Sequence, residues 1–295
     1  MKKRSPTWLS DLKSNTFSQI GEDGIIEKIL EIISEKNKYC VEFGAWDGKY
    51  LSNTRNLIVN KGFSAILIEG SKAKFEELEK NYLQNQKVVT LNKFVGFGPD
   101  DNLDEILGDT PTPVDFDFLS IDIDGNDYHV WKAMKRYRPK IVVVEFNPTI
   151  PTEVEFVQKA DHAVNQGSSL LAMTKLAKEK GYELVAVLPF NAFFVRRKYF
   201  NLFKISDNNP RILRTIVDDV TYLFVGYDGR ILLQGAKRMP WHGIRLKESK
   251  MQVLPGFLQK HPNNYNRIEH RIIHGYRIFS NPGKFLRKVY SFFRS

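Results

Sequence analysis

The sequence has only one cysteine among its 295 residues, Cys40. A single cysteine excludes an internal disulfide framework, so we expect a reducing compartment. No apolar run approaches the ~18 residues that a membrane-spanning helix needs. Residues 1–6 are basic, but no apolar segment follows them, so no secretory signal is expected. Together these absences predict a cytoplasmic protein.

Acidic residues are scarce near the end of the sequence. The formal net charge is +10, and residues 251–295 hold eight Lys and Arg against a single acid, Glu269. Such a segment meets nucleic acid, anionic lipid or an acidic substrate, or it is only a solvated face. Charge alone does not choose among these interpretations.

Residues 283–295 interleave basic side chains with aromatic and aliphatic ones. The apolar members are Phe285, Leu286, Val289, Tyr290, Phe292 and Phe293, and the basic ones are Lys284, Arg287, Lys288 and Arg294. The pattern resembles a basic amphipathic helix that lies on an anionic membrane. Packing on the domain with the basic face outward is the alternative. Nucleic-acid binding is disfavoured, because no recognised helix-turn-helix, zinc or RNA-binding motif supports it.

Short apolar runs alternate with helical patterns through the first two thirds of the chain. The hydrophobic content of 42% is ample for a substantial core. We expect strands over residues 39–43, 64–68, 88–95, 116–123 and 141–146. We expect helices over residues 25–33, 53–59, 72–82, 128–134 and 169–180. Nearly continuous apolar runs are typical of parallel strands that are buried on both faces.

Two hairpin signals follow the fifth strand. Residues 183–188 and 192–195 flank a short turn, and residues 221–226 and 231–233 flank an Asp-Gly turn. Five strand–helix units closed by a reversed strand predict an α/β, doubly wound, Rossmann-like sheet of seven strands with an antiparallel last strand. We expect an N-terminal helical segment over 1–36, this domain over 37–200, and an extension with the second hairpin and the basic tail over 201–295.

A glycine turn closes the first strand. Val41-Glu42-Phe43-Gly44-Ala45-Trp46-Asp47-Gly48 ends an apolar run with an acid and two glycines, which permits a close backbone approach to a ligand. Glu69 ends the second strand, where a carboxylate accepts hydrogen bonds from both hydroxyls of a ribose. The two features predict a nucleoside-bearing cofactor. The reversed strand favours S-adenosylmethionine (SAM) over NAD, because class I methyltransferases insert their last strand in this way.

These motifs resemble those of the FkbM-like methyltransferases, a class I group that uses SAM. The resemblance rests on the glycine turn, on Glu69 and on Asp122-Ile123-Asp124-Gly125, and it extends over residues 18–196. The chain departs from the family where Asp124 and Asp127 stand in place of glutamates, which shortens each carboxylate's reach by one methylene.

The resemblance implies a set of cofactor-binding residues. Glu42 would orient the methionine end, Asn53 and Thr54 would bind its carboxylate, and Glu69 would hold the ribose. The implied set is Glu42, Gly44, Ala45, Gly48, Asn53, Thr54, Glu69, Gly70, Phe94, Val95 and Asp122, with Phe94 and Val95 bordering the adenine. The alternative is that the acids are ordinary polar strand ends and the glycines ordinary turn residues.

Carboxylates gather after the fourth and fifth strands. Asp122 and Asp124 are two residues apart, so they point the same way if the strand continues through them, and Asp127 follows. Glu145 and Asn147 end the next strand. Asp122, Glu145 and Asn147 offer the hard oxygen ligands that Mg²⁺ prefers. The alternative is that the acids cap the following helix. An EF-hand is excluded, because Asp127 and Ala133 stand where that loop needs glycine and glutamate.

An alcohol acceptor needs a base or a metal to promote alkoxide character. The candidate catalytic residues are Asp122, Asp124 and His129, with His162 as a further candidate base. For a lone histidine, a surface or packing role is the alternative. Residues 19–23 either cover the site or form an ordinary capped helix start.

The resemblance implies a SAM-dependent O-methyltransferase that acts on a sugar hydroxyl in surface-glycan biosynthesis. One alternative is a methyltransferase for a polyketide or another small metabolite. The other is a non-catalytic nucleoside-binding module that its basic tail recruits to a membrane. The sequence carries no prediction of oligomeric state.

Overall fold

A computed structural model of the chain describes residues 4–34 and 36–280. The predicted amphipathic tail, residues 283–295, lies outside the described residues. The chain divides into two compact units, Met1–Val217 and Asp218–Ser295. The first unit runs beyond residue 200 because two short helices, α7 (Arg197–Phe200) and α8 (Pro210–Leu213), pack against the last strands of its sheet.

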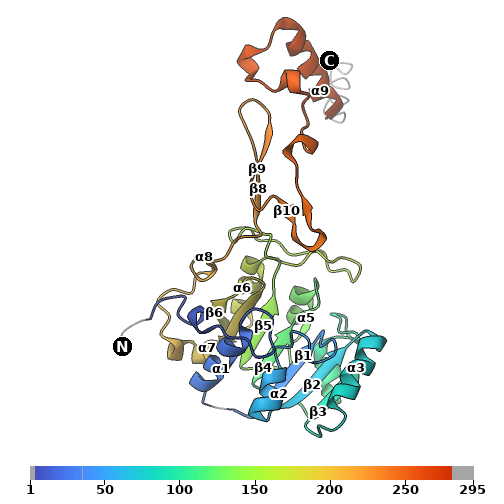
Figure 1. The fold of residues 1–295 in the computed structure, drawn as a ribbon, viewed down its shortest axis with the longest axis vertical. Coiled ribbons are helices and arrows are strands. Elements are labelled where there is room, and N and C mark those ends of the chain that lie inside the picture. Colours follow the sequence, from blue (N-terminus) through green and yellow to red (C-terminus); the bar gives the residue numbers. More distant parts are fainter. Residues whose placement is uncertain (1–3, 35, 281–295) are drawn as a thin grey trace, which may run out of the picture. The chain divides into compact units, whose positions relative to one another are not determined.

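The first unit is built on a seven-stranded sheet with the order β3-β2-β1-β4-β5-β7-β6 (Figure 1). Its strands are β1 (Tyr39–Phe43), β2 (Ser64–Glu69), β3 (Val88–Asn92), β4 (Phe118–Ile121), β5 (Ile141–Glu145), β6 (Tyr182–Val187) and β7 (Asn191–Arg196). Strands β1 to β5 pair in parallel, and β7 pairs antiparallel with both β5 and β6. The predicted Rossmann-like sheet with its reversed strand is confirmed.

Helices cover both faces of this sheet (Figure 1). They are α1 (Glu22–Ile32), α2 (Arg55–Lys61), α3 (Lys72–Tyr82), α4 (Leu103–Gly108), α5 (Asp127–Ala133) and α6 (Leu170–Glu179). Val41 and Phe43 of β1 pack into one hydrophobic core, whereas Cys40 of the same strand packs into a second core. Alternate side chains of a strand point to opposite faces, so both faces of the central strands are largely apolar.

The ends of several elements differ from the prediction. Strand β3 stops at Asn92, so Phe94 and Val95 lie in the loop beyond it rather than on the strand. Strand β4 stops at Ile121, so Asp122 follows the strand rather than ending it. Helix α4 was not predicted, although Asn102 marks its start by accepting a hydrogen bond from the backbone of Glu105.

The second unit contains two small antiparallel sheets and one long helix. Strand β8 (Thr221–Val225) pairs with β9 (Ile231–Gly235), β10 (Arg238–Met239) pairs with β11 (Ile244–Arg245), and α9 spans Arg267–Ser280. Short 3₁₀ turns occur in both units, at Ser10–Leu12, Asn201–Phe203, Pro240–His242, Glu248–Lys250, Gly256–Leu258 and Pro262–Asn264. Among the described residues, no helix combines the length and the apolar character that crossing a bilayer requires.

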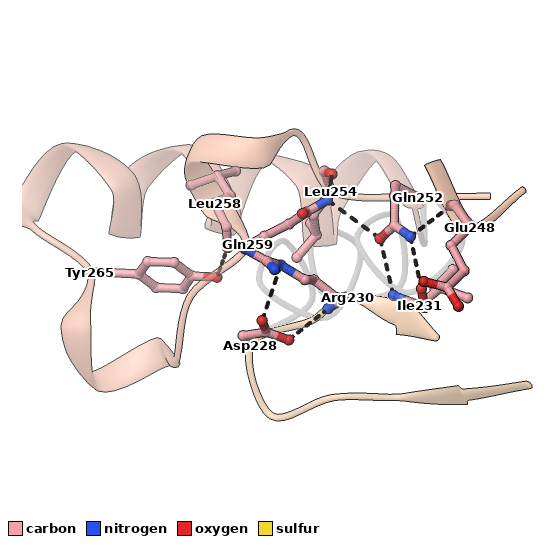
Figure 2. Close-up of polar contacts among 9 residues, drawn as sticks. All are labelled: Asp228, Arg230, Ile231, Glu248, Gln252, Leu254, Leu258, Gln259 and Tyr265. Atoms are coloured by element: carbon pink, nitrogen blue, oxygen red, sulfur yellow. Dashed lines mark hydrogen bonds and ion pairs between the residues drawn. The ribbon is translucent and has the colours of Figure 1, made fainter. Parts of the chain in front are cut away.

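One glutamine fastens the β8–β9 hairpin to the segment that follows it (Figure 2). The side chain of Gln252 donates to the carbonyl of Ile231 (2.8 Å) and accepts from the amide of the same residue (3.0 Å). It also donates to the carbonyl of Glu248 (2.7 Å). Strand β9 is therefore held on both edges, by β8 and by Gln252, whereas β8 pairs with β9 alone.

Candidate functional site

The glycine turn after β1 brings the ends of two strands together. Gly44 has φ +71°, and a Cβ atom built there would lie 1.9 Å from the carbonyl oxygen of Asp122. Gly48 has φ +69°, and its Cβ would lie 2.5 Å from side-chain atoms of Leu78 and Tyr82 in α3. The Tyr82 hydroxyl donates to the carbonyl of Gly48 (2.7 Å). Both positions therefore require glycine, for close packing as well as for backbone conformation.

Glu42 is buried, and its carboxylate organises the loop that leads into α2. It accepts hydrogen bonds from the Ser52 hydroxyl (2.6 Å), the Asn53 amide (2.9 Å) and the Thr54 hydroxyl (2.6 Å). Burial raises the pKa of Glu42, and these hydrogen bonds oppose the rise. The Asn53 side chain reaches across to the Ser120 hydroxyl (3.0 Å). Glu42 thus fixes the positions of Asn53 and Thr54, both expected cofactor contacts.

Glu69 joins two loops at the carboxyl edge of the sheet. One carboxylate oxygen accepts from the backbone of Trp46 (2.8 Å), and the other accepts from the backbone of Ser71 (2.7 Å). The next residue, Gly70, approaches the Phe94 ring, because a Cβ at residue 70 would lie 3.5 Å from it. The Phe94 side chain is 62% exposed. The structure therefore gathers Glu69, Gly70 and an open aromatic face, which suits a nucleoside.

Val95 and Ala45, two other predicted cofactor residues, are buried in the structure. Val95 is buried in the hydrophobic core, and Ala45 is buried and donates its amide to the carbonyl of Ile68 (3.1 Å). Trp46 is about half exposed, with the ammonium of Lys74 4.7 Å from its ring centre. Trp46 therefore offers a second aromatic surface beside Glu69, whereas Val95 is buried and offers no exposed surface.

Three carboxylates converge beyond the ends of β4 and β5. One oxygen each of Asp122, Asp124 and Glu145 lies within 4.8 Å of the other two. Asp124 has φ +54°, a left-handed conformation that aspartate tolerates better than most residues, and this turn lies beyond the strand. The convergence follows from the turn and from the neighbouring strand, not from the strand alternation expected for Asp122 and Asp124.

The environment of this cluster favours protonated carboxyls. Burial, and then the charges of Asp127 and Asp124, raises the pKa of Asp122 to about 8. Burial, and then the charge of Asp122, raises the pKa of Glu145 well above its usual range. Asp122 and Glu145 also share a hydrogen bond. Like charges this close cannot all be ionised without a compensating proton or cation.

Asp127 belongs to the turn rather than to the converging carboxylates. Its two oxygens accept from the amides of Ile123 and Gly125, both at 2.9 Å. Burial raises its pKa to about 6 against these hydrogen bonds. Asp127 is the first residue of α5, so its role is the one expected of an acid at a helix start.

The side chain of Asn147 hydrogen-bonds to the connection that follows β5. Its amide oxygen accepts from the backbone (2.8 Å) and the hydroxyl (2.7 Å) of Thr149, and its amide nitrogen donates to the carbonyl of Gln166 (2.6 Å). To act as a metal ligand, Asn147 would have to release its hydrogen bonds from Thr149. Asp124 lies with Asp122 and Glu145, so it is a further candidate beside the predicted ligand Asn147.

His129 and His162 both contact the ring of Phe97. The His162 ring stacks on Phe97 at 4.4 Å and meets Phe94 edge-on at 5.2 Å, while His129 lies 5.4 Å from Phe97. Nε2 of His129 is 2.8 Å from the carbonyl of Gln158. A carbonyl only accepts, so this nitrogen carries the proton, and His129 has Nδ1 left for acting as a base.

Sequence reasoning missed Gln158, which is 1% exposed. Its side-chain nitrogen donates to Asn126 Oδ1 (2.9 Å) and to the carbonyl of Val164 (2.8 Å). Its side-chain oxygen accepts from the amides of Gln166 (2.9 Å) and Gly167 (2.8 Å). Gln158 therefore holds the long connection after β5 against the turn that carries the acids. A single polar residue in a polar loop gives no sequence signal for such a role.

The N-terminal segment reaches the same edge of the sheet. Asp23 accepts from the amides of residues 16–18, so it orders the loop that precedes α1. Glu22 is fully buried and accepts from the side chain of Asn191 (3.0 Å), the register partner of Glu145. The oxygen of the Asn191 amide is buried without a hydrogen-bond partner. Residues 19–23 thus border the carboxylate cluster through Asn191.

Comparison with known proteins finds a family match for part of the chain. Residues 84–184 match the family model described as Methyltransferase FkbM domain. A comparison with curated proteins found no match. Similar solved structures include the N-terminal domain of EvdMO1 in the presence of SAH and D-fucose, at 11% identity over 65% of this chain and 94% of that one, with a TM-score of 0.39.

Two further similar structures are methyltransferases by their descriptions. A SAM-dependent methyltransferase from Aquifex aeolicus has 14% identity over 65% of this chain and 97% of that one, with a TM-score of 0.36. Magnesium protoporphyrin IX methyltransferase from Synechocystis PCC 6803, with bound SAH, has 10% identity over 59% and 81%, with a TM-score of 0.38. These similarities are too low to indicate a substrate.

The seven-stranded sheet with a reversed strand defines the class, a Rossmann-like methyltransferase fold. Within that class, residues 84–184 match the methyltransferase FkbM domain, which supports a SAM-dependent methyltransferase of the FkbM type. The resemblance predicted from the glycine turn, Glu69 and the Asp122 motif is confirmed.

Proposed function

We propose that this methyltransferase acts on oxygen and methylates a hydroxyl group. The observation that carries the proposal is the cluster of Asp122, Asp124 and Glu145, within 4.8 Å of one another beside the Gly44 turn. Bound SAM would supply an activated methyl group. An alcohol acceptor must in addition lose its proton, and a carboxylate cluster is a suitable place to receive it.

Asp122 is the first candidate base. Its raised pKa, about 8, lies near neutral pH, which is where a general base transfers protons most effectively. In the proposed step, the acceptor proton passes to the carboxylate, the acceptor oxygen bonds to the methyl carbon, and the carbon–sulfur bond breaks to leave S-adenosylhomocysteine. His129 is the second candidate and would act through Nδ1. Asp124 would tune the cluster by its charge.

The same cluster fits a divalent cation. Three carboxylate oxygens at this spacing, each from a group whose neighbours repel its charge, match the hard oxygen ligands of Mg²⁺. Asp122, Asp124 and Glu145 would hold the ion, and it would supply Lewis-acid stabilisation of the developing alkoxide. Asn147 would join them only after releasing Thr149.

The proposed acceptor is a sugar hydroxyl in surface-glycan biosynthesis, with a polyketide or another small metabolite as the second candidate. The support for a sugar is the family resemblance alone. A non-catalytic nucleoside-binding module is the remaining alternative.

The experiment has two stages. Calorimetric titration with SAM and S-adenosylhomocysteine should show binding of both, and Glu69→Gln should weaken it while Glu79→Gln, an exposed change on α3, should not. Transfer of labelled methyl from SAM to sugar and polyketide acceptors then identifies the reaction. Absence of affinity for either nucleoside contradicts the cofactor assignment. Binding without transfer to any hydroxyl acceptor favours the non-catalytic module.

A further inference from the structure

Almost all of the chain's net charge belongs to its second unit. Residues 218–295 contain fourteen Lys and Arg against five Asp and Glu, which is +9 of the total +10. The methyltransferase unit is therefore nearly neutral, and the unit that follows it is strongly basic. Such an imbalance favours an anionic partner for the second unit, and the exposed side chains decide whether it has one.

The β8–β9 hairpin in this unit exposes apolar side chains on both of its faces. Four consecutive residues of β8 are exposed, namely Tyr222, Leu223, Phe224 and Val225, and Tyr227 in the turn is 94% exposed. Successive strand residues point to opposite faces, so both faces of β8 expose apolar side chains in the described part of the unit. Proteins usually protect an exposed edge strand with lysine, proline or a bulge, and β8 has none of these.

The β10–β11 hairpin repeats the combination on a smaller scale. Trp241 is 61% exposed in the turn between the two strands, and the paired residues Met239 and Ile244 are exposed beside it. The next pair is Arg238 opposite Arg245, and like charges directly opposite each other destabilise a ladder. Asp219 neutralises Arg238 at 2.5 Å.

Arg245 carries the uncompensated charge of this pair. Among residues 4–34 and 36–280, no acid lies within ion-pair distance of Arg245, Lys247 or Lys250, all of which are exposed. An anion would compensate the charge of Arg245 and would meet an apolar tip next to it. The hairpin thus offers an aromatic residue and cations side by side.

We propose that the β8–β9 and β10–β11 hairpins dock the protein on an anionic lipid bilayer. Trp and Tyr favour the bilayer interface, where one end of the side chain is apolar and the other wet. Basic residues near an anionic surface each contribute about 1 kcal/mol. Trp241, Tyr222 and Phe224 enter the interface, and Arg245 with its neighbouring lysines contacts lipid phosphates.

A bilayer explains these features better than other partners do. A second copy of the chain would bring two units of charge +9 together, which opposes association. Single-stranded nucleic acid stacks on aromatic rings, but it leaves Leu223, Val225 and Ile244 without an apolar environment. The unpaired edge of β8 keeps the hairpin in the interfacial region of the bilayer. Its backbone groups need hydrogen-bond partners, and the hydrocarbon core has none.

The test uses the full chain and sedimentation with vesicles of phosphatidylcholine, with or without phosphatidylserine. The wild type should bind the anionic vesicles, less so at high salt. The double variant Trp241→Ser/Arg245→Gln should have a partition coefficient lower by roughly tenfold or more. The control Leu83→Ser/Lys80→Gln makes the same kind of change at exposed positions at the end of α3 and just after it, and should bind like the wild type.

An unchanged circular dichroism spectrum shows that each variant is folded, and unchanged affinity for S-adenosylhomocysteine keeps this test independent of the proposed reaction. Equal partitioning of the Trp241 variant and the wild type, or no binding by the wild type, overturns the proposal. Two other results also overturn the proposal. One is dimerisation in solution that the Trp241 variant loses. The other is binding of single-stranded oligonucleotides without vesicles that the Trp241 variant loses.

Discussion

Gly44 passes so close to Asp122 that a Cβ atom at residue 44 would lie 1.9 Å from the Asp122 carbonyl oxygen. The turn that is expected to bind the methyl donor and the cluster that is expected to activate the acceptor are therefore in backbone contact. Any side chain at residue 44 would push them apart. Gly62 offers a comparison, because its φ of +72° is nearly the same but the nearest atom to its Cβ would be the flexible Lys87 ammonium at 3.8 Å.

Gly44→Ala should destabilise the protein far more than Gly62→Ala. Both changes place alanine in a left-handed conformation, which costs about 1 kcal/mol. Only Gly44→Ala adds a backbone clash, and we expect a loss of about 3 kcal/mol or more in the free energy of unfolding. Urea titration of the two variants measures the difference. Equal losses would mean that β1 and β4 do not approach each other as described.

Gln158→Leu should loosen the connection after β5. The change removes an amide that makes four hydrogen bonds and leaves the partners of those bonds buried, at a cost of roughly 2–4 kcal/mol. Gln166→Leu is the matched control, since the Gln166 side chain is exposed on the same connection, and it should be nearly neutral. Urea titration should separate the two, and methyl transfer by Gln158→Leu should fall under conditions where it remains folded. Equal stability of the two variants would remove the positioning role of Gln158.

The sheet was predictable because its signal is local. Strands such as β5 are apolar at every position but the last, and parallel strands deliver their carboxyl ends to one edge, so the meeting of Glu69, Asp122 and Glu145 at that edge followed from the sequence. Helix α4 could also have been predicted from the sequence. Asn102 followed by Glu105 is a helix-start pattern, although the helix itself is only six residues long.

The details of the site depend on contacts between distant residues. Asn147 looks like a ligand in sequence, but its oxygen is used by Thr149 two residues later. Gln158 looks like an ordinary loop residue, but the fold buries it against Asn126. The exposed apolar side chains of β8 are a third case, because a run such as Tyr222 to Val225 reads as a buried strand. In each case the role of the residue depends on what it contacts in the fold, and the sequence does not show that contact.

Asp124→Asn should stabilise the protein at pH 8 and have no effect near pH 4. Asp122 has a folded pKa of about 8, above its ordinary value of 3.8, so the folded state binds more protons than the unfolded chain between these values. The stability from this group is complete at low pH and is lost as pH rises toward 8. Removing the charge of Asp124 lowers the Asp122 pKa and reduces that loss. Asparagine also tolerates the positive φ of this position.

Thermal unfolding in the presence of a chelator, from pH 4 to pH 8, measures this difference. We expect a rise in Tm of roughly 1–3 °C at pH 8 for Asp124→Asn relative to the wild type. Asp100→Asn, an exposed change outside the cluster, should follow the wild type at every pH. A constant difference between Asp124→Asn and the wild type across this range would contradict the raised Asp122 pKa.

Magnesium should reverse the same pH effect. A cation held by Asp122, Asp124 and Glu145 binds only when these carboxyls are ionised, so it should stabilise the protein at pH 8 and not at pH 4. Saturation at a hundred times the dissociation constant corresponds to about 2.7 kcal/mol, which thermal unfolding detects easily. Glu145→Gln should lose the rise in Tm, whereas Glu155→Gln, an exposed change in the connection after β5, should keep it. Methyl transfer should fall on exhaustive chelation and return with Mg²⁺. A wild-type Tm that ignores Mg²⁺ at pH 8, together with full activity after chelation, would leave Asp122 acting as a base without a metal.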